Sequence, residues 1–377
     1  MGFKYFYTFL FLYLIALTHT LVAQPVASAW SFHASYGMIW AQNPPVKHLS
    51  SSHTYALQAD YHLPLSGRKP WHKNYRYPDI GFSALFFDFQ QKRLGKAYSA
   101  LAFIDRHLDK KRRWTYRLGF GTALHSRYFD KNTNHTNQAI GALQSAAVQL
   151  GFLYKRRIAD EWFLQCGLLL SHYSNGASKM PNSGLNLPTL SVGVRRGSRE
   201  ITGTHLPDSL LIKRPIHYGW EGQLAAHLGR KETYPVGGEK YMFYTLAAYA
   251  AYRRTEKSAW NFGAEGIYNN TLKFERAALY DSTYQNRDIK RLSVLAGHEL
   301  YFGRISLLTQ IGVYVYKKIP LNPFMYQRVG IKYYWKQNFY ASANLRVHFG
   351  KADGVEWGAG LRLHSLRKKK TMALNNP

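Results

Sequence analysis

The sequence predicts an all-β fold, an antiparallel transmembrane β-barrel of about 16 strands, with 12 or 14 strands as alternatives. Three observations predict it. Aromatic residues make up 16% of the 377 residues, an export signal begins the chain, and apolar and polar residues alternate over segments of about ten residues. After the N-terminal segment, no stretch reaches the roughly 18–20 continuous apolar residues of a transmembrane helix, so any crossing must be made by strands.

The N-terminal segment has the order of a secretory signal peptide. Lys4 precedes an apolar run over residues 5–17, and small residues precede Gln24, which suits cleavage after Ala23. An uncleaved membrane anchor is the alternative. We expect a signal peptide at 1–23, an outer-membrane barrel over 24–366 and a short basic and polar tail at 367–377.

Alternation defines the strands in order. In NFYASANLRVHF, residues 338–349, the odd positions are apolar and the even positions are polar or charged, as in a strand with one wet face. The pattern recurs at 220–228, 305–316 and 355–364, with Arg, His and Glu on the face expected to line a lumen. A soluble β-sandwich would show shorter strands of roughly 5–6 residues. The expected strand centres are residues 35, 59, 84, 100, 118, 149, 167, 191, 221, 245, 262, 294, 310, 330, 343 and 359, of which 100, 245 and 330 are weakly patterned. Loops are expected at 42–52, 130–138, 175–186, 197–208 and 269–287.

Composition restricts the function. The net charge of +29 predicts an anionic partner, which could be nucleic acid, a membrane surface or an acidic lipid. A disulfide scaffold and a cysteine zinc site are excluded because Cys166 is the only cysteine. The sequence contains no G-x-S-x-G, H-E-x-x-H or P-loop motif, and its 16 His residues are scattered, so we expect no metal and no cofactor.

One segment departs from the background, at residues 161–192. Its even positions are apolar from Trp162 to Leu170 and would face lipid, but the same face ends in His172 and Ser174. Residues two apart in a strand are neighbours on one side, so these side chains can approach the 2.6–3.2 Å typical of general-base activation. If the N-terminus starts in the periplasm, this seventh strand ends at the outer leaflet. The other H-x-S matches, at residues 33–35 and 48–50, are expected to be ordinary strand and loop.

The residues that follow carry a resemblance. His172-Tyr173-Ser174-Asn175, followed by Pro181-Asn182-x-Gly184-x-Asn186, resembles the lipid A 3-O-deacylase family of outer-membrane barrels. The resemblance implies Ser174 as nucleophile and His172 as base. The family's triad Glu is Asn186 here, which can orient an imidazole but carries no charge. Another acid could act instead, but Glu161 is expected to point inward at the opposite end of the strand, and nothing in the sequence supports Asp130.

Two further groups complete the expected site. Backbone N–H groups at Asn175 and Gly176, and the Asn182 amide, could stabilise an oxyanion, or these residues could simply make a hairpin loop. Basic side chains could hold lipid phosphates or be solvated loop cations, and they are Arg127, Lys131 and Lys179.

Three functions compete. The first is an outer-membrane serine esterase that removes an ester-linked acyl chain from lipid A, the lipid of lipopolysaccharide, in the outer leaflet. The second is a non-enzymatic barrel, a pore or an adhesin, which leaves the lipid-side His and Ser unexplained. The third, a soluble nucleic-acid-binding protein, disagrees with export and with the aromatic apolar face, so we expect no nucleic-acid partner.

Overall fold

The computed structural model describes residues 28–65, 67, 69–197, 218–275, 286–335 and 338–364. The expected signal peptide at 1–23 and tail at 367–377 lie outside the described residues. So do most of the expected loop at 197–208 and part of the one at 269–287.

Sixteen strands make up most of the described chain, and each expected strand centre falls within one of them. The first eight are β1 (Ala29–Met38), β2 (His53–Pro64), β3 (Asp79–Asp88), β4 (Lys96–His107), β5 (Trp114–His125), β6 (Gln144–Arg157), β7 (Trp162–Ser174) and β8 (Leu185–Gly197). The second eight are β9 (Gly219–Glu232), β10 (Lys240–Thr255), β11 (Ser258–Asn269), β12 (Lys290–Phe302), β13 (Ile305–Lys317), β14 (Met325–Tyr334), β15 (Phe339–His348) and β16 (Lys351–His364). Short helical turns join some of them: η2 (Pro44–Leu49), α2 (Pro70–Asn74) and η4 (Asn270–Phe274). In the part of the chain described, no helix is both long and apolar enough to cross a membrane.

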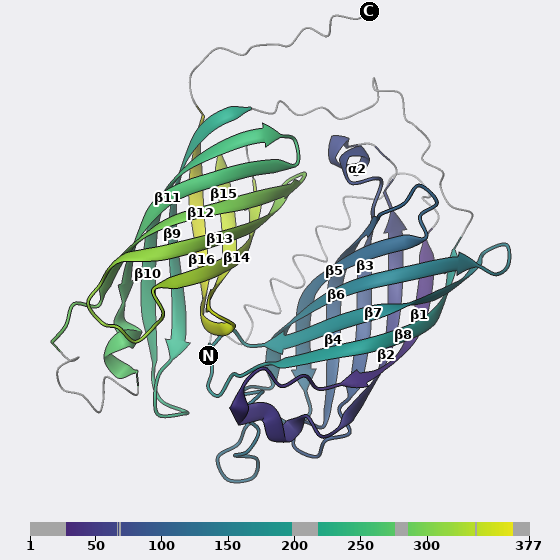
Figure 1. Cartoon of the computed structure of the whole chain (residues 1–377), viewed down its shortest axis with the longest axis horizontal. Coiled ribbons are helices and arrows are strands. Elements are labelled where there is room, and N and C mark those ends of the chain that lie inside the picture. Colours follow the sequence, from purple (N-terminus) through teal and green to yellow (C-terminus); the bar gives the residue numbers. More distant parts are fainter. Residues whose placement is uncertain are drawn as a thin grey trace, which may run out of the picture.

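The strands close into two barrels. β8 pairs back with β1 and β16 pairs back with β9, all antiparallel, so eight strands close each barrel (Figure 1). The prediction of an antiparallel all-β fold with 16 strands is confirmed, but the single barrel expected over 24–366 is wrong. Alternation is a local signal that shows which face of a strand is wet and does not show which distant strands pair.

Each barrel has an apolar outer face and buried charged pairs in its interior, and the interior of the first barrel also holds a cluster of apolar side chains. In the first, buried Arg117 lies 2.7 Å from both Asp60 and Asp105. In the second, buried Arg328 lies 2.7 Å from Glu265 and 3.1 Å from Glu356. Eight strands enclose a space that side chains can just fill, and these ion pairs occupy it.

The two barrels lie side by side (Figure 1). We call the end that carries the β7–β8 loop the site end. There, Met180 N donates to Glu232 Oε1 at 3.3 Å, joining the β7–β8 loop to the end of β9. At the opposite end, Asn74 Nδ2 donates to Glu256 Oε2 at 2.6 Å. Both pairs join corresponding ends, so the site-end loops of the two barrels lie on one side of the molecule.

Candidate active site

The outward face of β7 leads to the site. Trp162, Leu164 and Leu168 on this face are exposed, as the alternation predicts. The same face continues to His172 and Ser174 at the end of the strand, where both become half-buried. A polar pair therefore ends an apolar stripe on the outside of the barrel wall.

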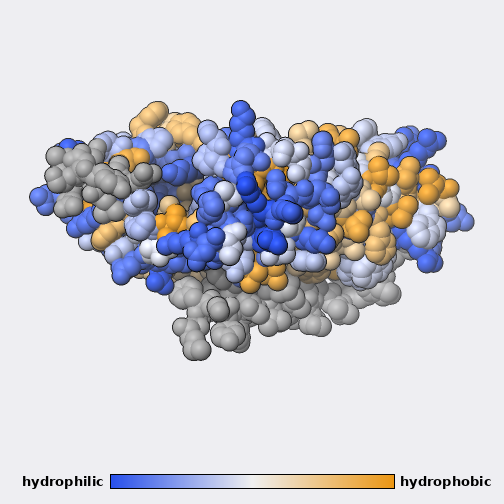
Figure 2. All heavy atoms as spheres, turned by 90° about the horizontal axis from the view of Figure 1, so that it is seen from below, coloured by the Kyte–Doolittle hydropathy of each residue, from blue (hydrophilic) through white to orange (hydrophobic). Residues whose placement is uncertain are grey.

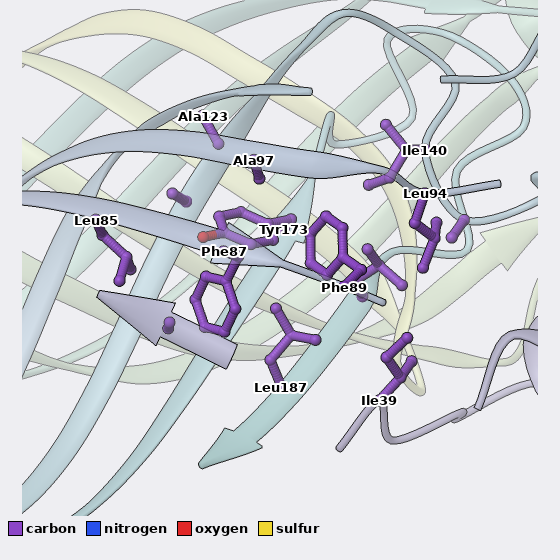
Figure 3. Close-up of a cluster of buried hydrophobic side chains, with 14 of the residues drawn as sticks. Ile39, Leu85, Phe87, Phe89, Leu94, Ala97, Ala123, Ile140, Tyr173 and Leu187 are labelled. Atoms are coloured by element: carbon purple, nitrogen blue, oxygen red, sulfur yellow. The ribbon is translucent and has the colours of Figure 1, made fainter. Parts of the chain in front are cut away.

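Tyr173 lies between the pair and fixes its direction. Its side chain is fully buried inside the first barrel, where its hydroxyl lies 2.9 Å from Ser99 Oγ. Its ring meets the Phe87 ring edge-on, with centroids 6.0 Å apart. Figure 3 shows Tyr173 within a cluster of buried apolar side chains that also includes Phe89 and Leu187. Because successive side chains of a strand alternate sides, anchoring Tyr173 inward turns both of its neighbours outward.

His172 has a partner on the neighbouring strand. The register of β7 and β8 places Asn186 directly opposite His172. His172 Nδ1 lies 2.7 Å from Asn186 Oδ1, and the Asn186 side chain is buried. An amide oxygen can only accept, so Nδ1 carries the proton and Nε2 keeps a free lone pair. The imidazole thus has the tautomer that a general base requires.

Ser174 is held by donors from the loop that follows. Asn182 Nδ2 donates to Ser174 Oγ at 2.9 Å, and Gly176 N donates to the same oxygen at 3.2 Å. Asn175 N donates to Asn182 Oδ1 at 2.9 Å, which fixes the orientation of the Asn182 amide. Of the three expected oxyanion residues, Asn182 and Gly176 therefore direct N–H groups at the serine oxygen, whereas the Asn175 N–H is used to orient Asn182.

The serine and the histidine are not hydrogen-bonded to each other. In the described residues, the Ser174 hydroxyl has Asn182 Oδ1 as its acceptor, at 3.3 Å, and no bond to His172. Catalytic hydrogen bonds are often long or poorly aligned before substrate binds. A rotation of the Ser174 side chain about its Cα–Cβ bond would redirect the hydroxyl.

Gly184 and the β5–β6 loop are parts of the site whose roles the sequence did not reveal. Gly184 has a φ of +72°, and a Cβ there would lie 3.1 Å from His172 Cε1. Gly184 N donates to Ala139 O at 3.1 Å and Ser183 N donates to Gln138 O, also at 3.1 Å. Ala139 and Ile140 are fully buried and follow the polar run at 130–138. Two apolar residues after a polar run were the sequence signal that this loop packs against the site.

The alternative acids lie elsewhere. Glu161 stands in the turn before β7, at the opposite end of the strand, 3.5 Å from Arg196. Its carboxylate is half exposed, so the expectation that it points inward was wrong, because alternation does not extend into the turn. Asp130 Oδ1 accepts hydrogen bonds from the backbone and hydroxyl of Thr133, which lower the pKa of its carboxyl group. Neither carboxylate is bonded to His172 in the described residues.

The other H-x-S matches have ordinary environments. His33 and Ser35 are buried in β1, and His33 Nε2 lies 3.1 Å from Ser31 Oγ in the barrel interior. His48 is in η2, where its Nε2 lies 3.0 Å from Thr136 O, and Ser50 caps that turn by donating to Lys47 O at 2.6 Å. Of the three matches, only the pair on β7 lies on the outward face of a barrel strand with its imidazole bonded to a side chain of the next strand.

The three predicted cations lie on the site end. Lys179 belongs to the β7–β8 loop, and its Nζ lies 5.8 Å from the centre of the Tyr128 ring. Arg127 and Lys131 are exposed in the β5–β6 loop. Across the described chain, no group of three or more His, Cys, Asp or Glu side chains is arranged to hold a metal ion.

Comparisons with known proteins follow the division into two barrels. Residues 55–195 match the family model for lipid A 3-O-deacylase (PagL), and residues 220–365 match that for the acyloxyacyl hydrolase C-terminal domain. The comparison with curated proteins gave no match.

Several solved structures are similar over most of their length. A Rhodopseudomonas blastica porin triple mutant is 9% identical, with 89% of this chain and 100% of that chain covered and a TM-score of 0.18. CdiB from Acinetobacter baumannii is 9% identical, with 91% and 60% covered and a TM-score of 0.19. Scores this low support no argument about function. The family models cover most of the chain, one on each barrel, and the chain belongs to the lipid A 3-O-deacylase (PagL) family.

Proposed function

We propose that the protein is an outer-membrane serine esterase that removes an ester-linked acyl chain from lipid A. The observation that carries the proposal is the outward pair on β7, in which His172 is held by Asn186 Oδ1 at 2.7 Å and Ser174 Oγ meets two N–H donors. Membership of the family supports the substrate class.

The position of the pair suits a lipid substrate. Most site-end loops, such as those at 39–52, 126–143 and 175–184, are longer than most at the opposite end, such as 108–113, 158–161, 256–257 and 303–304. The exceptions are 65–78 at the opposite end and the two-residue turn at 349–350 at the site end. Outer-membrane barrels have short periplasmic turns and longer extracellular loops, so the site end would face outward. His172 and Ser174 would then lie at the outer leaflet, where lipopolysaccharide resides, and an acyl ester could reach them from the membrane.

The reaction assigns a task to each group. Ser174 Oγ attacks the acyl carbonyl carbon while its proton passes to His172 Nε2. As the carbonyl oxygen becomes negative, the N–H groups of Gly176 and Asn182 would move from Ser174 Oγ to that oxygen and stabilise it. The bond between the carbonyl carbon and the sugar oxygen then breaks, and His172 returns the proton to that oxygen. Water, activated by His172 in turn, hydrolyses the acyl-serine and releases the fatty acid.

The passive pore, one form of the non-enzymatic alternative, fits this fold poorly. Buried side chains occupy the described interior of each barrel, as ion pairs in both and as an apolar cluster in the first, so neither interior resembles the open channel of a large porin. An adhesin is still compatible with the fold, but it would have no need for an imidazole tautomer fixed beside a serine on the membrane side.

Ser174→Ala tests the proposal. The variant is expected to fold, since Ser174 is half-buried at a strand end, and to lose deacylation by several orders of magnitude. Mass spectrometry of lipid A from cells that express each form measures the trimming. Ser178→Ala in the same loop and Ser35→Ala in the other H-x-S match are the controls and should trim normally. Unchanged trimming by Ser174→Ala would remove the catalytic assignment.

A further inference from the structure

The second barrel also presents cations on the site end. Arg230 near the end of β9 and Lys240 at the start of β10 are exposed, and neither has an ion pair among the described residues. Their neighbour Lys231 points inward and forms ion pairs, because its Nζ lies 2.6 Å from Glu275 and 3.3 Å from Asp353. Arg230 and Lys240 are therefore exposed positive charges on the outer face of this barrel.

Contacts between the barrels bring these cations toward Lys131 and Lys179, two of the cations predicted from the sequence. Glu232 follows the outward parity of β9, yet it is buried, because Met180 N at 3.3 Å and Gly237 N at 2.8 Å donate to its Oε1. The Lys131 ammonium lies 3.1 Å from where a Cβ on Gly237 would stand. Lys131 comes from the first barrel and Gly237 from the second, so the loops of the two barrels meet here.

The cations act on one another across this boundary. The positive charges of Arg230 and of Lys179, which belongs to the first barrel, both repel the Lys240 ammonium. Glu232, whose Oε1 also accepts two backbone amides, attracts the Lys240 ammonium more strongly than either cation repels it. The nearby Glu239 accepts the Tyr241 hydroxyl at 2.7 Å. Positive charge thus exceeds negative charge where the barrels meet. Figure 2, which views the molecule of Figure 1 from below, shows hydrophilic residues across the middle of this face.

The same loop connects this region to the serine. Asn175 Nδ2 donates to Lys179 O at 2.8 Å, so the residue next to Ser174 fixes the backbone that carries Lys179. A Cβ on Gly176 would clash with Val355 Cγ2 of β16, which shows how closely the loop packs on the second barrel. A ligand that contacts the cations would therefore be held at a set position relative to Ser174.

We propose that Lys179, Arg230 and Lys240 form a phosphate-binding site shared by the two barrels, and that it holds the phosphate groups of the lipid A whose acyl ester lies at Ser174. The proposal rests on the proposed function and gives the second barrel a part in substrate recognition. Gathered like charges are unfavourable without an anion, and a phosphate group supplies two negative charges and several acceptor oxygens to relieve them. A phosphate on the same molecule as the ester would also orient that ester.

The test compares two substrates that differ only in phosphate. The full-length protein carrying Arg230→Ala and Lys240→Ala is assayed in detergent micelles on bisphosphorylated lipid A and on the same lipid after enzymatic dephosphorylation. We expect the KM for the phosphorylated lipid to rise roughly tenfold, since charge-assisted contacts are lost, with kcat nearly unchanged. The KM for the dephosphorylated lipid should stay constant. Arg254→Ala, an exposed cation at the opposite end of β10, is the matched control and should change neither value.

Equal changes on both lipids, or none on either, would overturn the proposal. Heat-modifiable migration on gels checks folding, and single Arg230→Gln and Lys240→Gln variants replace the double variant if it does not fold. Binding of both lipids to Ser174→Ala protein, with and without the cation changes, gives a readout that needs no catalysis. Millimolar inorganic phosphate should compete with the phosphorylated lipid and leave the dephosphorylated lipid unaffected, and equal inhibition of both lipids would contradict the assignment. Ester cleavage by Ser174→Ala protein would instead refute the proposed function and leave the binding result interpretable.

Discussion

The hydrogen bond between His172 and Asn186 gives the sharpest test of the site chemistry. A neutral hydrogen bond contributes about 0.5–1.5 kcal/mol, so Asn186→Ala should lower kcat roughly two- to tenfold. The N···O distance is 2.7 Å, and Asp has the shape of Asn, so Asn186→Asp should keep this geometry while adding a charge. Bonds to charged groups contribute about 1.5–3 kcal/mol, and the imidazolium forms only during reaction, so a gain of about five- to tenfold in kcat is expected.

Asn186→Glu restores the residue type that the family resemblance implies. Its side chain is one methylene longer and the site is buried, so the carboxylate must fold back to reach Nδ1. We expect activity equal to or above that of the natural protein and at or below that of Asn186→Asp. The assay is fatty-acid release from lipid A at saturating substrate in detergent, which reports kcat. Asn338→Asp, an exposed site at the opposite end of the second barrel, controls for the added charge. The same rate for Asn, Ala, Asp and Glu at position 186 would mean that this residue does not orient His172.

Two further predictions concern the loop and the membrane. Gly184→Ala should lower kcat about tenfold, because a Cβ 3.1 Å from His172 Cε1 displaces the ring, whereas Gly350→Ala, with a φ of +87° and open space around its Cβ, should cost only local backbone strain. Equal losses of activity from the two variants, measured as kcat, would attribute the effect to strain alone. The protein should also fractionate with the outer membrane, begin at Gln24 and migrate differently on gels after heating. Recovery as a soluble periplasmic species would contradict the membrane placement.

Sequence reasoning located the strands because their signal is local. The segment at 338–349 became β15, Phe339–His348, and even the weakly patterned centres at 245 and 330 lie in β10 and β14. Strand closure had no comparable signal. Pairing of β8 with β1 depends on contacts between distant residues, such as Phe32 with Val194, which alternation leaves open.

The sequence could predict the contacts of the site that lie between the two strands of one hairpin. His172 and Asn186 lie on adjacent strands joined by one loop, so their pairing followed from the order of the motif. The orienting bond from Asn175 to Asn182 could not be foreseen, since it depends on the path of the loop. Neither could the support from Ala139, which comes from a loop of another hairpin.

The division into two barrels changes the surroundings of Ser174. In a single barrel of 16 strands, the β7–β8 loop would meet only the loops beside it on the rim and the membrane outside. Closing β9–β16 separately gives the second barrel an outer wall, and the loop at Gly176 seats against Val355 on that wall. The buried Glu232 on the same wall accepts the amide of Met180 from the loop, so the contact is polar as well as apolar. Deleting the second barrel would therefore remove one side of the serine's surroundings. The role of the second barrel should accordingly be measured from the substrate preferences of the full-length protein, not from those of the first barrel alone.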